Sequence, residues 1–260
     1  MSVITFFPTP AIIVQIGPIA LHTYGAMYAL GAICGYFLLQ FLARRKKLNI
    51  RNELLLDLVF WTFLGGVIGG RIFYVLVYNF SYFLHSPSEI FAVWHGGMSI
   101  HGGLLGGALA AIIFIRRKKL PLWSIAGIIA PAVALGMMFG RIGNFANGEL
   151  FGRPTLLPWG MDFGDGIKRH PAQLYAAAKD LILFCAFLGL NLKTQISGKA
   201  LWSYFLIGYG VLRFGVEFFR EPDPQIGLFW GVLSLGQILS IAVIFVGIII
   251  LRTKKTRQKA

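Results

Sequence analysis

Runs of hydrophobic residues recur seven times along the chain and are separated by short polar or basic stretches. Each run is close to the roughly 20 residues that an α-helix needs to cross the hydrocarbon core of a bilayer. The pattern predicts seven membrane-spanning helices, over residues 21–42, 54–78, 98–115, 122–140, 174–192, 200–219 and 231–251. We therefore expect an all-α polytopic membrane protein in which residues 1–260 form a single integral-membrane domain.

The composition agrees with this class of protein, because hydrophobic residues make up 57% of the chain and charged residues only 13%. The formal net charge of +14 would suit a nucleic-acid-binding protein if the cations covered a soluble surface. They gather instead in loops, so we expect no nucleic-acid partner. Four basic clusters follow the first, third, fifth and seventh predicted helices: Arg44, Arg45, Lys46, Lys47 and Arg51; Arg116, Arg117, Lys118 and Lys119; Lys193 and Lys199; and Arg252, Lys254, Lys255, Arg257 and Lys259.

These clusters also predict the orientation of the chain. If every helix crosses the membrane, all four clusters lie on one side, and the positive-inside tendency makes that side cytoplasmic. The amino terminus is then outside and the carboxyl terminus inside. On the outer side we expect an interfacial arm over residues 79–97, rich in aromatic residues, and a small cap over residues 144–171 between the fourth and fifth helices.

Small residues within the predicted helices suggest how the helices pack. Glycine pairs at 65–66, 69–70, 102–103 and 106–107 predict that some helices approach each other closely. Cys34 and Cys185 lie in apolar stretches without the spacing of a redox or metal motif. We interpret both as buried small hydrophobic residues.

Polar side chains from five predicted helices fall at a similar depth in the outer half of the bilayer. At 1.5 Å per residue, Arg213, Arg71 and Arg141 lie about 20, 25 and 28 Å from the inner face of a core about 30 Å thick. By the same count, Tyr24 and His101 lie only about 5 Å below the outer surface. The convergence predicts one site built from residues that are far apart in the sequence.

An arginine within a membrane span costs about 2.5–3.5 kcal/mol on insertion scales, so these arginines require partners. Either they pair with internal carboxylates or reach the membrane surface, or they bind an anion. Glu149 and Glu217 are too few to neutralise the three arginines together with Arg220. Because a guanidinium binds phosphate oxygens in pairs, we favour an anionic lipid headgroup from the outer leaflet.

Other polar positions have two readings. His101 is either a hydrogen-bonding anchor or a proton-transfer residue, since its glycine neighbours would let a substrate approach the ring. Tyr24 is either an aromatic-belt residue or a hydrogen-bond donor to phosphate. Lys179 and Asp180 are adjacent and point about 100° apart on a helix, so we interpret them as packing residues with partners on other helices.

Several blocks of the sequence resemble the prolipoprotein diacylglyceryl transferases of bacterial inner membranes. The most distinctive is GRIGNFANGELFGR at 140–153, and the others are GGMSIHGG at 96–103, HPAQLY at 170–175 and the segment 209–223 that carries Arg213, Glu217 and Arg220. Tyr24-Gly25 in the first predicted helix is similar as well. Four blocks in order with suitable spacing are specific. One departure is Ala176, where the family commonly has a glutamate.

The resemblance implies transfer of the diacylglyceryl group of phosphatidylglycerol to the thiol of the lipobox cysteine in a prolipoprotein signal peptide. A thioether forms and glycerol phosphate leaves, with no metal and no cofactor. The protein would be multi-pass in the bacterial cell inner (cytoplasmic) membrane, with membrane lipid and the signal peptide as partners. Arg141 and Arg213 would be essential, and the following residues would surround the site: Tyr24, His101, Asn144, Glu149, Gly152, Tyr209, Glu217 and Arg220.

The residues suit this reaction, which needs cations on the departing phosphate and an acceptor for the thiol proton. Arg141 and Arg213 fit the first task. His101 is the best-placed acceptor, with Glu149 or a phosphate oxygen of the substrate as alternatives. Two other functions use similar residues: an anionic-lipid transporter and a lipid-binding membrane assembly factor. A transporter is expected to spread polar residues across the whole bilayer depth, whereas here they crowd the outer half.

Overall fold

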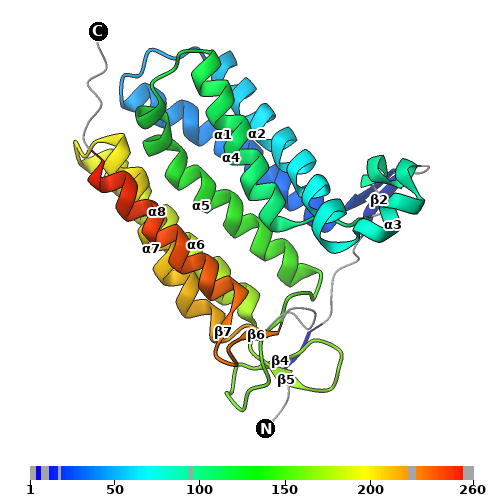
Figure 1. Ribbon diagram of the computed structural model, residues 1–260. Helices are drawn as coiled ribbons and strands as arrows, with labels where there is room; N and C mark the ends of the chain where they lie inside the picture. Colours follow the sequence, from blue (N-terminus) through cyan, green and yellow to red (C-terminus); the bar gives the residue numbers. More distant parts are fainter. Residues whose placement is uncertain (1–3, 7–11, 17–18, 94–95, 222–226, 254–260) are drawn as a thin grey trace.

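The computed structural model describes residues 4–6, 12–16, 19–93, 96–221 and 227–253. The described residues are mostly helical, and their long helices run side by side in one elongated bundle (Figure 1). These helices are α1 (Thr23–Arg45), α2 (Asn52–Phe73), α4 (Ile100–Arg117), α5 (Leu122–Ala146), α6 (Ala172–Lys193), α7 (Gly198–Glu217) and α8 (Leu235–Arg252). Each corresponds to one of the predicted hydrophobic runs.

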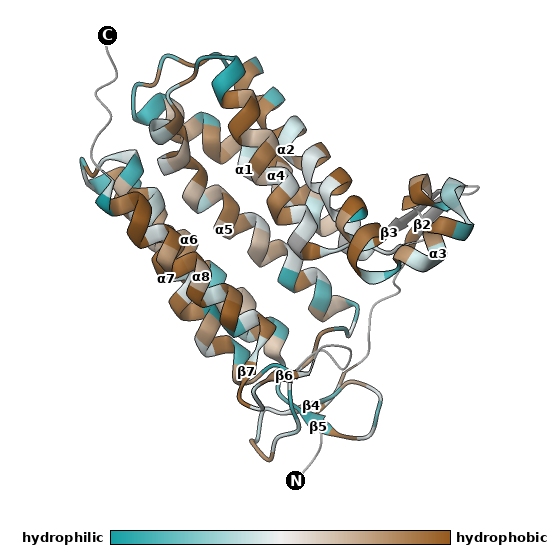
Figure 2. Cartoon of the chain, viewed as in Figure 1, coloured by the Kyte–Doolittle hydropathy of each residue, from teal (hydrophilic) through white to brown (hydrophobic). Residues whose placement is uncertain are grey.

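Five of the described helices are long and apolar enough to cross a membrane: α1, α2, α5, α6 and α8. Hydrophobic residues predominate along most of their length, and hydrophilic residues concentrate toward the ends of the bundle (Figure 2). A soluble protein of this size would bury such side chains, but Phe37, Phe60 and Phe245 are each more than half exposed. The chain is a multi-pass membrane protein.

Helix boundaries differ from the predicted ones where a local signal overrides hydrophobicity. Helix α5 continues to Ala146, beyond the predicted end at residue 140, and stops where Gly148 adopts a left-handed φ of 68°. Residues 144–146 therefore belong to a helix rather than to the predicted cap. Helix α8 begins later than predicted, because Ser234 and Gln237 form a capping box that starts the helix at Leu235.

The expectation of an all-α fold was incomplete, since short strands lie at the end of the bundle away from the basic loops and beside the arm (Figure 1). In the cap, β1 (Ile4–Thr5) pairs parallel with β4 (Met161–Asp162), which pairs antiparallel with β5 (Lys168–Arg169). Two hairpins add β2 (Ile12–Ile16) with β3 (Ile19–His22) and β6 (Leu228–Phe229) with β7 (Leu233–Ser234). Segments this short carry no recognisable period-two pattern.

The arm predicted over 79–97 contains a six-residue helix, α3 (Phe80–His85), and a 3₁₀ turn, η2 (Pro87–Phe91). It follows α2 through a π-helical turn, η1 (Tyr74–Tyr78), and projects from the side of the bundle (Figure 1). Residues 94 and 95 lie outside the described part. Phe91 is 78% exposed, as expected of an aromatic residue at an interface.

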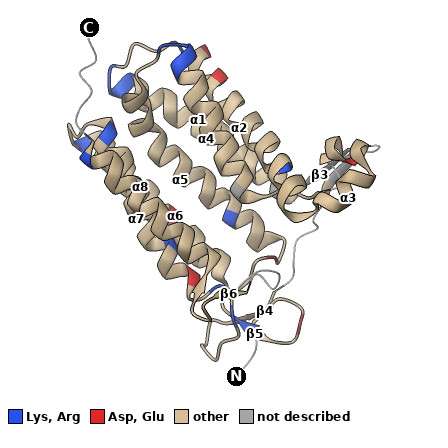
Figure 3. Cartoon of the chain, in the orientation of Figure 1, with Lys and Arg blue, Asp and Glu red and all other residues tan. Residues whose placement is uncertain are grey.

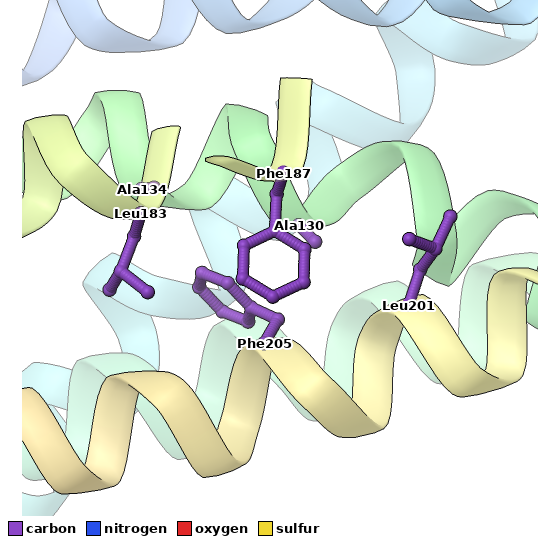
Figure 4. Close-up of a cluster of buried hydrophobic side chains, with 6 residues drawn as sticks. All are labelled: Ala130, Ala134, Leu183, Phe187, Leu201 and Phe205. Atoms are coloured by element: carbon purple, nitrogen blue, oxygen red, sulfur yellow. The ribbon is translucent and has the colours of Figure 1, made fainter. Parts of the chain in front are cut away.

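Helix α5 lies in the middle of the bundle and packs against α1, α6 and α7. Between α5, α6 and α7, six buried side chains form a hydrophobic cluster in which the rings of Phe187 and Phe205 meet edge to face at 5.4 Å (Figure 4). The cysteines are outside such clusters. Cys185 is exposed and Cys34 is half-buried, so the interpretation of both as buried residues was wrong.

The predicted close approach of glycine-rich helices is confirmed for α2 and α4. A Cβ atom built on Gly106 would lie 2.8 Å from the Cα of Gly69, and one built on Gly65 would lie 2.8 Å from the carbonyl oxygen of Gly106. Real side-chain carbons do not come that close to backbone. We call this contact, formed by Gly65, Gly69, Gly102 and Gly106, the glycine seam.

The basic clusters gather at one end of the bundle, as the sequence predicted for helices that all cross (Figure 3). Contacts between the loops hold that end together. Lys46 after α1 donates to the carbonyl of Thr194 after α6 at 3.0 Å, and Lys199 at the start of α7 donates to the carbonyl of Thr253 after α8. Residues 254–260, with the last lysines of the fourth cluster, lie outside the described part.

Candidate active site

The last turn of α7 carries a buried carboxylate that three other groups share. Glu217 is 3% exposed, and its Oε2 lies 2.6 Å from Nη2 of Arg213, one turn earlier. The Ser234 hydroxyl donates to Oε1 of Glu217 at 3.0 Å, and Nη1 of Arg220 lies 3.6 Å from the same oxygen. Gly236 packs against this carboxylate, because a Cβ there would lie 2.5 Å from Oε1. Glu217 therefore fixes Arg213 in one orientation.

A second polar chain begins on α5. Arg141 donates from Nη1 to Oδ1 of Asn144 at 3.4 Å, and Asn144 donates from Nδ2 to Oε1 of Glu149 at 2.8 Å. The Gln173 amide of α6 donates to the backbone carbonyl of Glu149 at 2.8 Å. The extension of α5 past residue 140 explains this arrangement, since residues three apart on a helix share a face.

The two polar chains come from adjacent helices, since α5 packs against both α6 and α7. Arg141 lies on α5, and Arg213 lies on α7 one turn after Tyr209. The convergence of Arg141 and Arg213 in one site stays a prediction, which the packing of α5 against α7 supports. Tyr209 lies in the same group, with the ammonium of Lys179 4.5 Å from the centre of its ring.

Lys179 and Asp180 are the most unexpected members of this group. The expected partner on another helix is present for Lys179, whose ammonium lies over the Tyr209 ring of α7, but the divergent directions expected of neighbouring side chains do not keep the two apart: they form an ion pair with exposed fractions of only 5% and 1%. Long side chains bend toward each other when burial leaves no solvent to solvate a separate ammonium and carboxylate. No spacing rule signals such a pair; the only hint in the sequence was two charges in an apolar run.

Gly152 ties the cap to the end of α7. It forms a backbone bridge with Arg220, and its amide donates to the carbonyl of His170 at 2.8 Å. A side chain at this position would overlap the carbonyl of Phe219 and the backbone of His170. The next amide, of Arg153, donates to the same Phe219 carbonyl at 3.0 Å. A glycine is therefore required where these two backbone segments approach each other.

Two side chains in the cap stabilise this junction. The Arg169 guanidinium lies 2.6 Å from Asp165, pairs with Glu221 and covers the ring of Phe151 at 4.9 Å. The ring of His170 lies 3.1 Å from the Tyr175 hydroxyl, and burial lowers the pKa of this histidine below its ordinary value. Burial therefore favours the neutral form of the ring, which packs against Tyr175 and Phe219.

Arg71 does not join the site that helix counting predicted for it. Its guanidinium donates to the carbonyls of Glu89, Ile90, Ala92, Gly96 and Gly97, at 2.5 to 3.2 Å, and lies 5.2 Å from the ring of Phe83. These contacts use every nitrogen of the side chain to hold the arm. The sequence could not reveal this role, because every residue has a backbone carbonyl and the residue types do not show which carbonyls accept hydrogen bonds from Arg71.

Tyr24 and His101 have backbones in the first turns of α1 and α4. Their side chains lie outside the described part of the structure. The first glycine after His101 has a structural explanation, since Gly102 packs on the backbone of Gly69 in the glycine seam. This explanation covers Gly102 alone, because a Cβ built on Gly103 would lie 3.5 Å from the Gly66 carbonyl oxygen, an ordinary contact.

The whole group carries an excess of positive charge. The cations Arg141, Lys179, Arg213 and Arg220 outnumber the carboxylates Glu149, Asp180 and Glu217 by one. Among the described residues, no group of three His, Cys, Asp or Glu side chains lies close enough together to hold a metal ion. A buried site with one excess cation is suited to a singly charged anion.

Comparison with known proteins agrees with this geometry. The model of the family described as prolipoprotein diacylglyceryl transferase matches residues 11–253. The chain belongs to this family. Proteins named phosphatidylglycerol–prolipoprotein diacylglyceryl transferase are 44% identical in Geobacter sulfurreducens, over 90% of this chain and 91% of the relative, and 44% in Photobacterium profundum, over 94% and 93%. The relative of that name in Methylococcus capsulatus is 41% identical over 99% of this chain and 100% of its own length.

Membership of the diacylglyceryl transferase family accounts for which residues the fold brings together. Arg141, Asn144 and Glu149 come from the 140–153 block, and Tyr209, Arg213, Glu217 and Arg220 come from the 209–223 block. Gly152 joins the two blocks through its bridge to Arg220. Sequence reasoning missed Gln173 and Ser234, although Ser234 is recognisable as a helix N-cap residue.

Proposed function

We propose that this protein transfers the diacylglyceryl group of phosphatidylglycerol to the thiol of the lipobox cysteine of a prolipoprotein, releasing glycerol phosphate. A carbon–sulfur bond forms, the bond between the glyceryl carbon and the phosphate oxygen breaks, and the thiol gives up its proton. The observation that carries the proposal is the packing of α5, which carries Arg141, against α7, whose Arg213 pairs with the buried Glu217 in a group with one excess cation. The names of relatives at 41–44% identity supply the substrates.

In this proposal the two arginines bind the phosphate and stabilise the charge that it gains on leaving. Glu217 orients Arg213, and the Asn144–Glu149 chain orients Arg141. Tyr24, Tyr209 and Arg220 complete the lipid-binding side, and Gly152 acts by holding the cap against α7. His101 takes the thiol proton, and Glu149 or a phosphate oxygen is the alternative acceptor.

We further propose that all seven long helices cross the bacterial inner membrane, with the basic end in the cytoplasm and the amino terminus outside. The gathering of basic loops at one end of the bundle supports this orientation (Figure 3). The arm at 79–97 and the cap, which begins after α5 at residue 147 and runs to 171, then lie at the outer surface, where the lipobox peptide of an exported protein arrives.

The decisive experiment supplies purified protein in phosphatidylglycerol nanodiscs with a lipobox peptide and measures the thioether-linked product by mass spectrometry. A transporter or an assembly factor yields no such product. Arg141→Lys and Arg213→Lys keep the charge but lose the bidentate fork, so each loses on the order of 10²-fold in activity. Arg51→Lys is the matched control, because Arg51 is 77% exposed at the basic end. Near-native activity in both site variants would refute the arginine clamp.

A further inference from the structure

The ion pair of Lys179 and Asp180 is buried beside the ring of Tyr209, one turn before Arg213 on α7, yet the reaction as proposed gives it no task. The two side chains of the pair differ in how many contacts they make. Lys179 faces Asp180 on one side and the ring of Tyr209 on another. Within the described part of the chain, Oδ2 of Asp180 is buried and has no hydrogen-bond partner.

A buried carboxylate with an unused oxygen is a potential competitor for the arginines. A phosphate and the Asp180 carboxylate offer Arg141 and Arg213 the same chemistry, namely a negatively charged oxygen that accepts hydrogen bonds. The carboxylate is part of the protein, so it is always present at high effective concentration. Unless another cation neutralises it, the carboxylate lowers the affinity of the site for its anion.

We propose that Lys179 is a positioning residue that neutralises Asp180 and so keeps the charge of Arg141 and Arg213 available to the lipid phosphate. The proposal rests on the proposed function for the identity of the anion. With Lys179 present, the group has one excess cation, which matches the single charge of a phosphodiester. Without it, the excess disappears and the site is neutral before any substrate binds.

The test measures the binding of glycerol phosphate by calorimetry and steady-state kinetics with phosphatidylglycerol, on monodisperse folded protein. We expect Lys179→Met to raise the Kd of glycerol phosphate and the KM of the lipid by roughly tenfold or more. Removing the ammonium leaves the negative charge of Asp180 unbalanced, and a unit charge within about 10 Å of the bound anion has an effect of this size at an effective dielectric constant near 20. The value of kcat changes less. Lys179→Arg, which keeps the charge, retains binding close to that of the unmodified protein.

The double variant Lys179→Met, Asp180→Asn separates charge from packing. It removes the competing carboxylate while keeping its shape, so binding returns close to the original value. Asp180→Asn alone does not weaken binding. Unchanged binding in Lys179→Met, or a double variant as weak as Lys179→Met, would overturn the proposal. If the unmodified protein forms no thioether product, the proposed function fails instead, and the phosphate-binding comparison still tests the pair.

Discussion

Replacing Arg71 by lysine tests whether this arginine organises the arm rather than binding substrate. The guanidinium donates to five backbone carbonyls between residues 89 and 97, whereas an ammonium has only three donors. At least two carbonyls therefore lose their charged partner. Because an unsatisfied buried group costs about 1–3 kcal/mol, the arm is expected to lose roughly 2–6 kcal/mol of local stability.

Hydrogen–deuterium exchange in nanodiscs measures this loss. In Arg71→Lys, we expect the amides of residues 89–97 to exchange faster, because the arm opens more often, while amides in the middle of α7 exchange as before. Arg51→Lys is again the control, since the Arg51–Glu53 pair is exposed on both sides and contributes little. Unchanged exchange in the arm, or faster exchange throughout the bundle, would refute the assignment of Arg71 to the arm.

Three further outcomes are expected. Gly152→Ala forces a methyl group against the Phe219 carbonyl, so it should cost about 1–3 kcal/mol of stability in thermal unfolding and lower product formation, whereas an unchanged melting temperature would contradict the contact. His101→Gln should lower turnover by about 10²- to 10⁴-fold with a smaller effect on lipid binding, and unchanged rates would leave this residue as an anchor. The double variant Cys34→Ala, Cys185→Ala should remain active, because the reacting sulfur belongs to the peptide; a covalent intermediate on either protein thiol would count against this mechanism.

The number and order of the long helices could be predicted from the sequence, because hydrophobic length is a property of each segment alone. A constant rise per residue also converts sequence position into depth, which predicts similar levels for Arg141 and Arg213 on the adjacent helices α5 and α7. The glycine seam between α2 and α4 could be predicted from the sequence as well. Glycine pairs in a helix are visible in the sequence, and close packing is their usual consequence.

Other features depend on contacts that no local pattern encodes. Arg71 and Arg141 have similar predicted depths, but one binds carbonyls of the arm and the other lies beside Asn144. Rotation around the helix axis and the path of a nearby loop decide between these outcomes. The pairing of Lys179 with Asp180 depends likewise on burial from three helices, which overrides the divergent directions of neighbouring side chains.

The glycine seam also determines how the protein can be made more robust for purification in detergent. Alanine is a better helix former than glycine by about 0.5–1 kcal/mol, so replacing helical glycines is an attractive route to stabilisation. At Gly69 or Gly106 the substitution by alanine is expected to destabilise the protein, because the added methyl group would overlap backbone atoms of the opposite helix, which cannot move aside. Gly189 on α6 is the opposite case, with nothing within 4 Å of an added Cβ. Glycines that look alike in the sequence thus divide into those that hold two helices together and those that merely weaken one.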